Sequence, residues 1–169
     1  NSGVDIEKFS PPKKRLDVDR YVLMSSRMLS DKGVNEFCLA AKIVKQKLGD
    51  EVKFKLSGPI DNFSPTFISQ TSLEKITNSC GVDYLGDIEN MPELLASSLI
   101  FVLPSYYPEG IPKVLLEAAA SGVPVITTDH PGCKDAIIKG QTGLLVPAGD
   151  SITLANSIIE LLENDSLLI

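Results

Sequence analysis

Apolar and polar positions follow two different spacings along this chain. Short runs of apolar, β-branched and aromatic residues end in turn-forming residues, which is typical of strands in a sheet. Between these runs, apolar residues recur at the spacing of one helix face. The pattern predicts strands at residues 21–26, 52–58, 82–86, 99–105, 124–129 and 142–148. It predicts helices at residues 34–48, 64–80, 91–96, 113–121, 134–138 and 151–163.

The order of the predicted elements indicates the fold class. Strands and helices alternate, and parallel neighbouring strands need crossover connections that are most often helical. The expected fold is therefore α/β, a Rossmann-like doubly wound sheet of six parallel strands with helices on both faces. Ligands bind such sheets at the carboxyl ends of the strands, where the strand order reverses. The loops that follow the strands are thus where a site is expected.

The two ends of the chain differ from this regular middle. Residues 1–19 contain FSPPKKRLDVD, with a proline pair, a basic cluster and no periodicity. They predict a connector between domains or the start of a domain, and residues 20–169 are expected to form the Rossmann-like domain. The last residues, ENDSLLI, begin another apolar segment. The chain is therefore expected to be a piece of a longer protein.

Composition narrows the functional classes. With 43% hydrophobic and 22% charged residues among 169, the chain can bury a sizeable core. A formal net charge of -6 argues against general attraction to nucleic acid or anionic lipid, so an anion site needs individually placed cations. No window approaches the roughly 20 apolar residues that span a bilayer. The widely spaced Cys38, Cys80 and Cys133 predict reduced thiols and a cytoplasmic setting.

Two glutamates, Glu109 and Glu117, lie in the segment PSYYPEGIPKVLLEAAASGVPVITTD. Pro112 suits the first turn of a helix, and Gly122 suits its end. Apolar residues surround Glu117 on every side of this helix, which predicts that the helix is buried. An unpaired buried carboxylate is costly. Glu117 therefore needs hydrogen-bond donors, and a ligand rich in hydroxyl groups supplies them.

These motifs together resemble a known family. The E-x7-E pair in EGIPKVLLE, followed by AAASGVPVITTDHPGCKDAI and GQTGLLVPAGD, is similar to the donor-binding half of family 4 retaining glycosyltransferases, which have the two-domain GT-B architecture. The stretch GVDIEKF resembles the segment that enters their C-terminal domain, and SSRMLSDKG resembles their phosphate-binding loop. Within the family, the likeness is greatest to bacterial enzymes that add N-acetylhexosamines or related sugars to lipid-linked intermediates of capsule, O-antigen or glycoprotein glycans.

The resemblance implies a role for each matching residue. Arg27 and Lys32 correspond to the cations that hold the donor's diphosphate and neutralise the leaving group. Glu109 corresponds to a residue beside the donor sugar, and these three form the expected catalytic set. The expected nucleotide-sugar contacts are Glu117 on the ribose, the backbone of Gly110, Ile111 and Lys113 on sugar or phosphate, and the turn with Tyr84 and Leu85 around the base.

The same resemblance implies the reaction and its partners. The donor is expected to be a UDP-sugar, with a GDP-sugar as the alternative, and no metal is expected. The acceptor, a glycan or lipid-linked sugar, is expected to be presented by an N-terminal domain that this chain does not contain. The fragment alone is therefore expected to be inactive. The full-length enzyme is expected in the cytoplasm or at the inner face of the membrane, with only peripheral membrane contact and no nucleic-acid partner.

Simpler interpretations compete with these assignments. Arg27 and Lys32 also suit solvated positions at a strand end and a helix start, and Glu109 suits a first-turn acid favoured by the helix dipole. Glu117 also suits a pair with Lys113, four residues earlier on the same helix. His130 is expected to be a solvent-facing loop residue. The cysteines, Tyr106 and Tyr107 are expected to be packing residues.

Two departures from the family pattern and two other functional classes stay open. Ser26 stands where the family usually has glycine, and Asp135 stands where glutamate is common. A GT-B-fold isomerase or epimerase acting on a UDP-sugar also needs a nucleotide-sugar cleft, but with its own catalytic acids. A receiver-like α/β module needs an acidic cluster at the strand ends, and none is found in the sequence. The residues upstream of Asn1 discriminate these classes, because a transferase requires a second α/β domain there.

Overall fold

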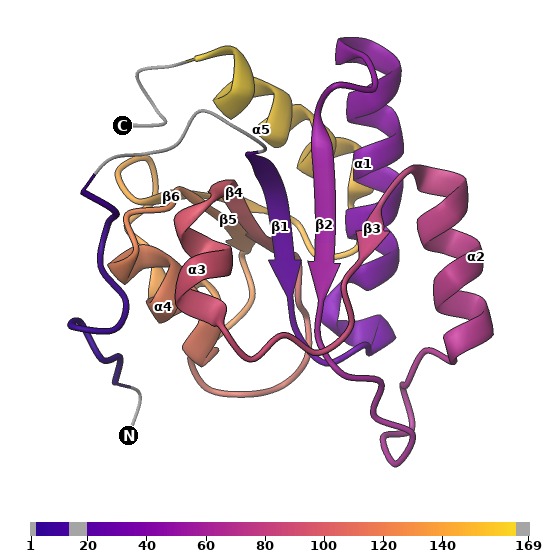
Figure 1. Ribbon diagram of the computed structural model, residues 1–169, viewed down its shortest axis with the longest axis horizontal. Coiled ribbons are helices and arrows are strands. Elements are labelled where there is room, and N and C mark those ends of the chain that lie inside the picture. Colours follow the sequence, from indigo (N-terminus) through magenta and orange to yellow (C-terminus); the bar gives the residue numbers. More distant parts are fainter. Residues whose placement is uncertain (1–2, 14–19, 165–169) are drawn as a thin grey trace.

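The computed structural model describes residues 3–13 and 20–164, and a six-stranded parallel sheet lies at its centre (Figure 1). The strand order is β3-β2-β1-β4-β5-β6. The chain thus moves outward from β1 to one edge and then returns to β4 on the other side of β1. This confirms the doubly wound fold. The strands are β1 (Tyr21–Ser25), β2 (Lys53–Ser57), β3 (Asp83–Tyr84), β4 (Ser98–Leu103), β5 (Val125–Thr128) and β6 (Gly143–Val146).

Helices cover both faces of this sheet, as the alternation predicts. The helices are α1 (Val34–Leu48), α2 (Gln70–Cys80), α3 (Met91–Ala96), α4 (Lys113–Ala120) and α5 (Ser151–Glu163), with short 3-10 helices η1 (Ser30–Lys32) and η2 (Lys134–Ala136). On one face, Phe37 of α1 packs edge-on against Phe54 of β2, with ring centroids 5.8 Å apart. On the other, the Tyr21 hydroxyl of β1 donates to the Leu94 carbonyl of α3 at 2.6 Å. Side chains of successive strand residues therefore point to opposite faces of the sheet and pack against different helices.

Several predicted elements are shorter than expected, mostly by one to three residues. The helix expected at 64–80 begins at Gln70, because the Ser69 side chain caps it by accepting from the Ser72 amide at 3.2 Å. Residues 64–67 form a turn instead, closed by the bond from the Phe67 amide to the Ser64 carbonyl at 3.2 Å. The strand expected at 82–86 covers only Asp83–Tyr84, and the helix expected at 134–138 is reduced to η2.

The N-terminal segment contacts the domain through Phe9. Phe9 is only 5% exposed and belongs to the same hydrophobic core as the central strands. A buried aromatic ring ties its backbone to the domain, because exposing it loses about 1.5 to 3 kcal/mol of burial. Residues 3–13 therefore pack on the domain, while residues 1–2 and 14–19 of the predicted connector lie outside the described residues.

Two further sequence expectations concern helices and thiols. In the part of the chain that the structure describes, no helix is long and apolar enough to cross a membrane. Cys38, Cys80 and Cys133 are free and buried. Burial, followed by the charges of Cys80 and Glu36, raises the pKa of the Cys38 thiol to about 12, so this side chain stays protonated at neutral pH.

Candidate functional site

A cleft of about 320 Å³ opens where β1 and β4 end, at the point where the strand order reverses. This is the position at which a doubly wound sheet binds its ligand. Five of the residues singled out from the sequence line the cleft, namely Arg27, Lys32, Glu109, Lys113 and Glu117. They come from the loop after β1, the turn η1, the loop after β4 and the helix α4.

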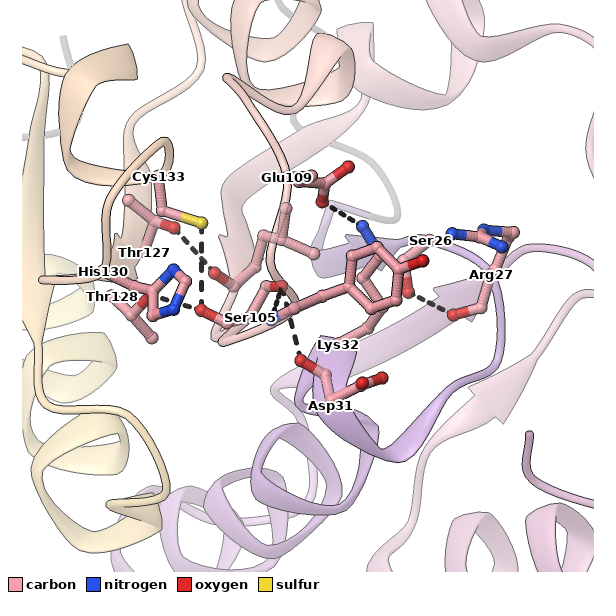
Figure 2. A network of polar contacts seen from close by, with 12 residues as sticks. Ser26, Arg27, Asp31, Lys32, Ser105, Glu109, Thr127, Thr128, His130 and Cys133 are labelled. Carbon is pink, nitrogen blue, oxygen red and sulfur yellow. Dashed lines mark hydrogen bonds and ion pairs between the residues drawn. The ribbon is translucent and has the colours of Figure 1, made fainter. Parts of the chain in front are cut away.

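Lys32 is the most enclosed charge in this cleft, since its side chain is 8% exposed. Its ammonium group forms an ion pair with the Glu109 carboxylate, although 77 residues separate the two in sequence. Figure 2 shows the Lys32 side chain directed at Glu109 from below. An enclosed ammonium without a counter-charge is unfavourable. The pair therefore keeps the cation in the cleft, and the interpretation of Lys32 as a solvated cation is wrong.

Gly33 explains how Lys32 reaches this position. It joins η1 to α1 in a left-handed conformation with φ of 89°. A Cβ atom placed on it would lie 2.3 Å from the carbonyl oxygen of Pro104. Only glycine fits both the backbone angle and this close approach. The turn that carries Lys32 is thus pressed directly against the end of β4.

Arg27 lies at the more open side of the cleft. Its guanidinium donates to the Asp61 carboxylate at 3.1 Å, and the two side chains are 40% and 26% exposed. Hydrogen bonding to Tyr107 is the largest cause that raises the pKa of Arg27 above its usual value; burial acts in the opposite direction, and the pair with Asp61 raises the pKa further. Arg27 therefore remains charged, and Asp61 is a partner that sequence reasoning missed, because it lies 34 residues away in a loop without a recognisable motif.

Glu117 lies on the face of α4 that borders the cleft. Burial raises the pKa of its carboxyl group, while the charges of Lys113 and Lys8 act in the opposite direction. Only Leu115 and Ala118 of α4 are fully buried, so the prediction of a wholly buried helix is wrong. The apolar residues around Glu117 pack partly on the domain and partly line the open cleft. The surroundings desolvate the carboxylate. Within the described residues, its side chain forms no hydrogen bond or ion pair.

The loop before α4 holds Gly110 and Ile111 beside Glu109. The loop after β5 packs against this loop. A Cβ atom on Gly132 would lie 2.6 Å from the Gly110 carbonyl oxygen and 2.7 Å from that of Glu109. The Gly132 amide donates to the Asp135 carboxylate at 3.2 Å. The aspartate that stands where the family commonly has glutamate thus makes a hydrogen bond within this loop. The His130 ring instead lies 3.0 Å from the Pro131 carbonyl oxygen.

Ser105 connects three of the loops around the cleft, a function that the sequence did not reveal. Its carbonyl oxygen accepts from the Thr128 hydroxyl and from the Cys133 thiol, whose sulfur lies 3.8 Å away. Its own hydroxyl lies 3.4 Å from the Asp31 carbonyl oxygen in η1. Figure 2 shows these contacts converging on Ser105 from both sides. The loop after β4 is therefore fixed to β5 and to the turn that carries Lys32.

Tyr84 and Leu85 belong to the end of β3 and the turn after it, beside the end of β2. The Tyr84 hydroxyl donates to the Gly58 carbonyl at 2.5 Å, and the Leu85 amide donates to the Leu56 carbonyl at 2.8 Å. Neither residue is among those that line the cleft. The structure thus fixes this turn to the end of β2 and to Gly58, whose backbone lies against Ser26 in the wall of the cleft.

The cleft combines three cations, Arg27, Lys32 and Lys113, with two carboxylates and one end of a helix. Within the described ranges, no group of three or more His, Cys, Asp or Glu side chains is placed to hold a metal ion. The acidic cluster that a receiver-like module requires is likewise missing from those residues. Paired cations beside the first turn of a helix suit an anionic ligand such as a phosphate.

Similar proteins were found among curated sequences and solved structures. The chain is 37% identical over 177 residues to the N,N'-diacetylbacillosaminyl-diphospho-undecaprenol alpha-1,3-N-acetylgalactosaminyltransferase of Campylobacter jejuni, covering 98% of the chain and 44% of that protein. It is 28% identical over 175 residues to the capsular polysaccharide biosynthesis glycosyltransferase CapM of Staphylococcus aureus, covering 99% and 45%. The chain thus spans less than half the length of these two relatives.

A solved structure supports the same grouping. A variant of TarM from Staphylococcus aureus, in complex with fondaparinux, alpha-GlcNAc-glycerol and UDP, matches with a TM-score of 0.82 and 25% identity over 98% of this chain and 32% of that one. The family model for glycosyl transferases group 1 matches residues 5–168, nearly the whole chain. The chain therefore belongs to the glycosyl transferases group 1 family.

Proposed function

We propose that this chain is the donor-binding domain of a retaining glycosyltransferase of cell-surface polysaccharide biosynthesis. The full protein would transfer an N-acetylhexosamine or a related hexose from a nucleoside diphosphate sugar to a glycan or a lipid-linked acceptor. The observation that carries this proposal is the convergence of Arg27, Lys32, Glu109 and Glu117 in one cleft at the reversal of strand order. The relatives' names, which describe an N-acetylgalactosaminyltransferase and a capsular polysaccharide glycosyltransferase, agree with it.

The two cations would hold the diphosphate of the donor. A diphosphate carries charge on several oxygens, and an Arg fork with a Lys point charge complements both its shape and its charge. In the transfer, the bond from the anomeric carbon to the diphosphate oxygen breaks and its electron pair stays on the diphosphate. Arg27 and Lys32 stabilise this developing charge from fixed positions. The acceptor hydroxyl then bonds to the anomeric carbon from the same side and gives its proton to the departing diphosphate.

The two carboxylates would recognise hydroxyl groups of the donor. Glu117 has a raised pKa because burial disfavours its charge, and hydrogen bonds from ribose hydroxyls would compensate that loss of solvent. Glu109 and the backbone of Gly110, Ile111 and Lys113 would lie beside the sugar, at the start of α4. The turn with Tyr84 and Leu85 would contact the base. The interpretations of Glu109 as a first-turn acid and of Glu117 as a partner of Lys113 are less consistent with the place of both carboxylates in the cleft.

The proposed donor is a UDP-sugar, with a GDP-sugar as the alternative. The related TarM variant was solved with UDP, whereas nothing in the cleft of this chain selects one base. We also propose that no metal is required, because the two cations already supply positive charge at the diphosphate. The acceptor would be presented by a domain outside this chain, on the cytoplasmic side of the membrane. The transferases among the relatives favour transfer over the isomerase or epimerase alternative.

Calorimetric titration of the 169-residue chain with UDP, GDP and ADP tests this proposal. The proposed diphosphate and ribose contacts all come from residues of this chain, so we expect saturable binding of UDP or GDP with a Kd of about 10⁻⁴ M. A circular dichroism spectrum typical of α/β proteins shows that the sample is folded. If the folded chain binds none of the three nucleotides, the donor-binding assignment is wrong.

A further inference from the structure

Tyr107 contacts Arg27 and Lys32, two of the three cations of the cleft, yet neither the family motifs nor the sequence pattern assign it a function. The Lys32 ammonium nitrogen lies 4.7 Å from the centre of the Tyr107 ring, and the guanidinium carbon of Arg27 lies 5.2 Å from it. Both distances are within the range of about 6 Å at which a cation is attracted to an aromatic ring. One aromatic ring thus contacts the two groups that are proposed to bind the diphosphate.

The backbone around Tyr107 is fixed to the turn that carries Lys32. The Tyr107 amide donates to the Ser105 hydroxyl at 3.1 Å, and the Tyr106 amide donates to the Asp31 carbonyl at 2.9 Å. Asp31 directly precedes Lys32 within η1. The ring is therefore presented by a segment that is hydrogen-bonded to the same turn, so its position relative to Lys32 is set by the fold.

The charges around the ring explain why such a contact is useful. Arg27 pairs with Asp61 at the open side of the cleft, and Lys32 pairs with Glu109 at the closed side. These carboxylates attract the two cations in different directions, and the cations also repel each other. An aromatic ring has a negative face and no net charge. It can attract both cations without competing with a diphosphate as a third carboxylate would.

We propose that Tyr107 is a positioning residue that keeps Arg27 and Lys32 converged on one diphosphate site before the donor binds. This inference rests on the proposed donor-binding function. It assigns the convergence to the ring, because both cations are close to its centre, whereas the hydrogen bond of Tyr107 reaches Arg27 alone. Preorganised cations lose less conformational freedom when the ligand arrives, so the ring should strengthen nucleotide binding without itself contacting the sugar.

The test compares variants of the 169-residue chain by titration with UDP. Tyr107→Phe keeps the ring and should bind UDP within about twofold of the parent, whereas Tyr107→Leu should bind about tenfold more weakly. Tyr106→Leu is the matched control, because Tyr106 is the neighbouring tyrosine and its hydroxyl lies 3.3 Å from the Ser30 carbonyl oxygen. That control should stay within about threefold of the parent. Tyr107→Gln is a second variant without the ring, should the leucine variant misfold.

A double-mutant cycle separates positioning from a general effect on the loop. In a Lys32→Met background the ring has one cation fewer to hold, so Tyr107→Leu should lose clearly less than tenfold. An equal loss in both backgrounds, or a phenylalanine variant as weak as the leucine one, would overturn the role of the ring. If Tyr107→Leu and Tyr107→Gln both bind UDP like the parent, the inference is wrong while the donor site stands. If the folded parent binds no nucleotide, the proposed function fails and takes this inference with it.

Discussion

Individual residues of the cleft are placed where they disfavour stability and favour binding. Glu117 illustrates this conflict, since burial raises the pKa of its carboxyl group and thereby disfavours its ionised form. A folded state that holds an acid at a raised pKa is destabilised wherever that acid is ionised. The arrangement is understandable if the carboxylate exists to accept hydrogen bonds from a ligand.

We predict opposite effects of Glu117→Gln on stability and on binding. At neutral pH the substitution removes a desolvated charge, so unfolding should require slightly more free energy, by less than about 1 kcal/mol. UDP binding should weaken about tenfold, because one acceptor site of the carboxylate becomes a donor. The stability advantage should shrink as the pH falls from neutral through the raised pKa of Glu117, where the parent takes up its proton. Denaturant titrations at several pH values and calorimetry with UDP measure both effects.

Glu109→Gln is the matched comparison, since it removes a carboxylate from the same cleft. Glu109 is paired with Lys32, so removing its charge also changes how freely Lys32 can bind the diphosphate of bare UDP. The informative quantity is the ratio of the affinities for a UDP-sugar and for UDP. Glu109→Gln should lower this ratio and Glu117→Gln should leave it unchanged, because only Glu109 is proposed to face the sugar. The same ratio for both variants would contradict the two roles.

At the scale of elements, the junction between η1 and α1 connects the fold to the site. Gly33 has a left-handed backbone and lies against Pro104, and the residue before it is Lys32. The hydrogen bond from the Gly33 amide to the Ser30 carbonyl, at 3.1 Å, closes the turn. Packing between two loops at the ends of β1 and β4 therefore determines where the ammonium group lies.

We predict that Gly33→Ala costs more than its conformation alone explains. Gly81→Ala is the control, since Gly81 is also left-handed, with φ of 71°, but a new Cβ would meet only the flexible end of Lys45 at 3.0 Å. The control should lower the free energy of unfolding by about 1 to 2 kcal/mol. Gly33→Ala should lower it by about 3 kcal/mol or more, because it adds a clash with backbone. Equal losses in urea unfolding would show that the loops yield easily.

At the scale of the whole molecule, the chain is proposed to supply the donor side of a transfer reaction. It covers 44% and 45% of the two curated relatives described above, so a comparable length of those proteins has no counterpart here. The cleft opens at the carboxyl edge of the sheet. The loops that follow the strands project from this same edge (Figure 1). An acceptor held by another domain would approach the donor from this edge.

We predict that the cations contribute to transfer in the full-length protein. Arg27→Ala and Lys32→Ala should each lower kcat/KM by about 10²-fold, the effect of removing one preorganised charge stabiliser. The assay is single-turnover transfer of a radiolabelled N-acetylhexosamine from its UDP donor to a lipid-linked sugar acceptor. A double variant that transfers at the parent rate would contradict the mechanism. Loss of parent activity on addition of EDTA would contradict only the metal-independent part of it.

The sequence by itself determined the secondary structure wherever a local pattern was strong. The helices Val34–Leu48, Met91–Ala96 and Ser151–Glu163 have the predicted bounds, because caps and apolar spacing act within a few residues. The alternation of elements determined the doubly wound topology, because parallel strands need helical crossovers. The motifs also marked Arg27 and Lys32, whose residue types and loop positions suit a phosphate.

Only the tertiary structure decided how these residues meet. The pair of Lys32 with Glu109 spans 77 positions and that of Arg27 with Asp61 spans 34, and no local pattern encodes either. From the sequence, Tyr107 was expected to be a packing residue. Its two cations come from the turn after β1 and from η1, far from Tyr107 in sequence, so only the folded structure brings them to its ring. Such contacts arise when loops at neighbouring strand ends pack together. Sequence spacing fixes which residues share an element, whereas burial and charge pairing between elements fix which of them share a site.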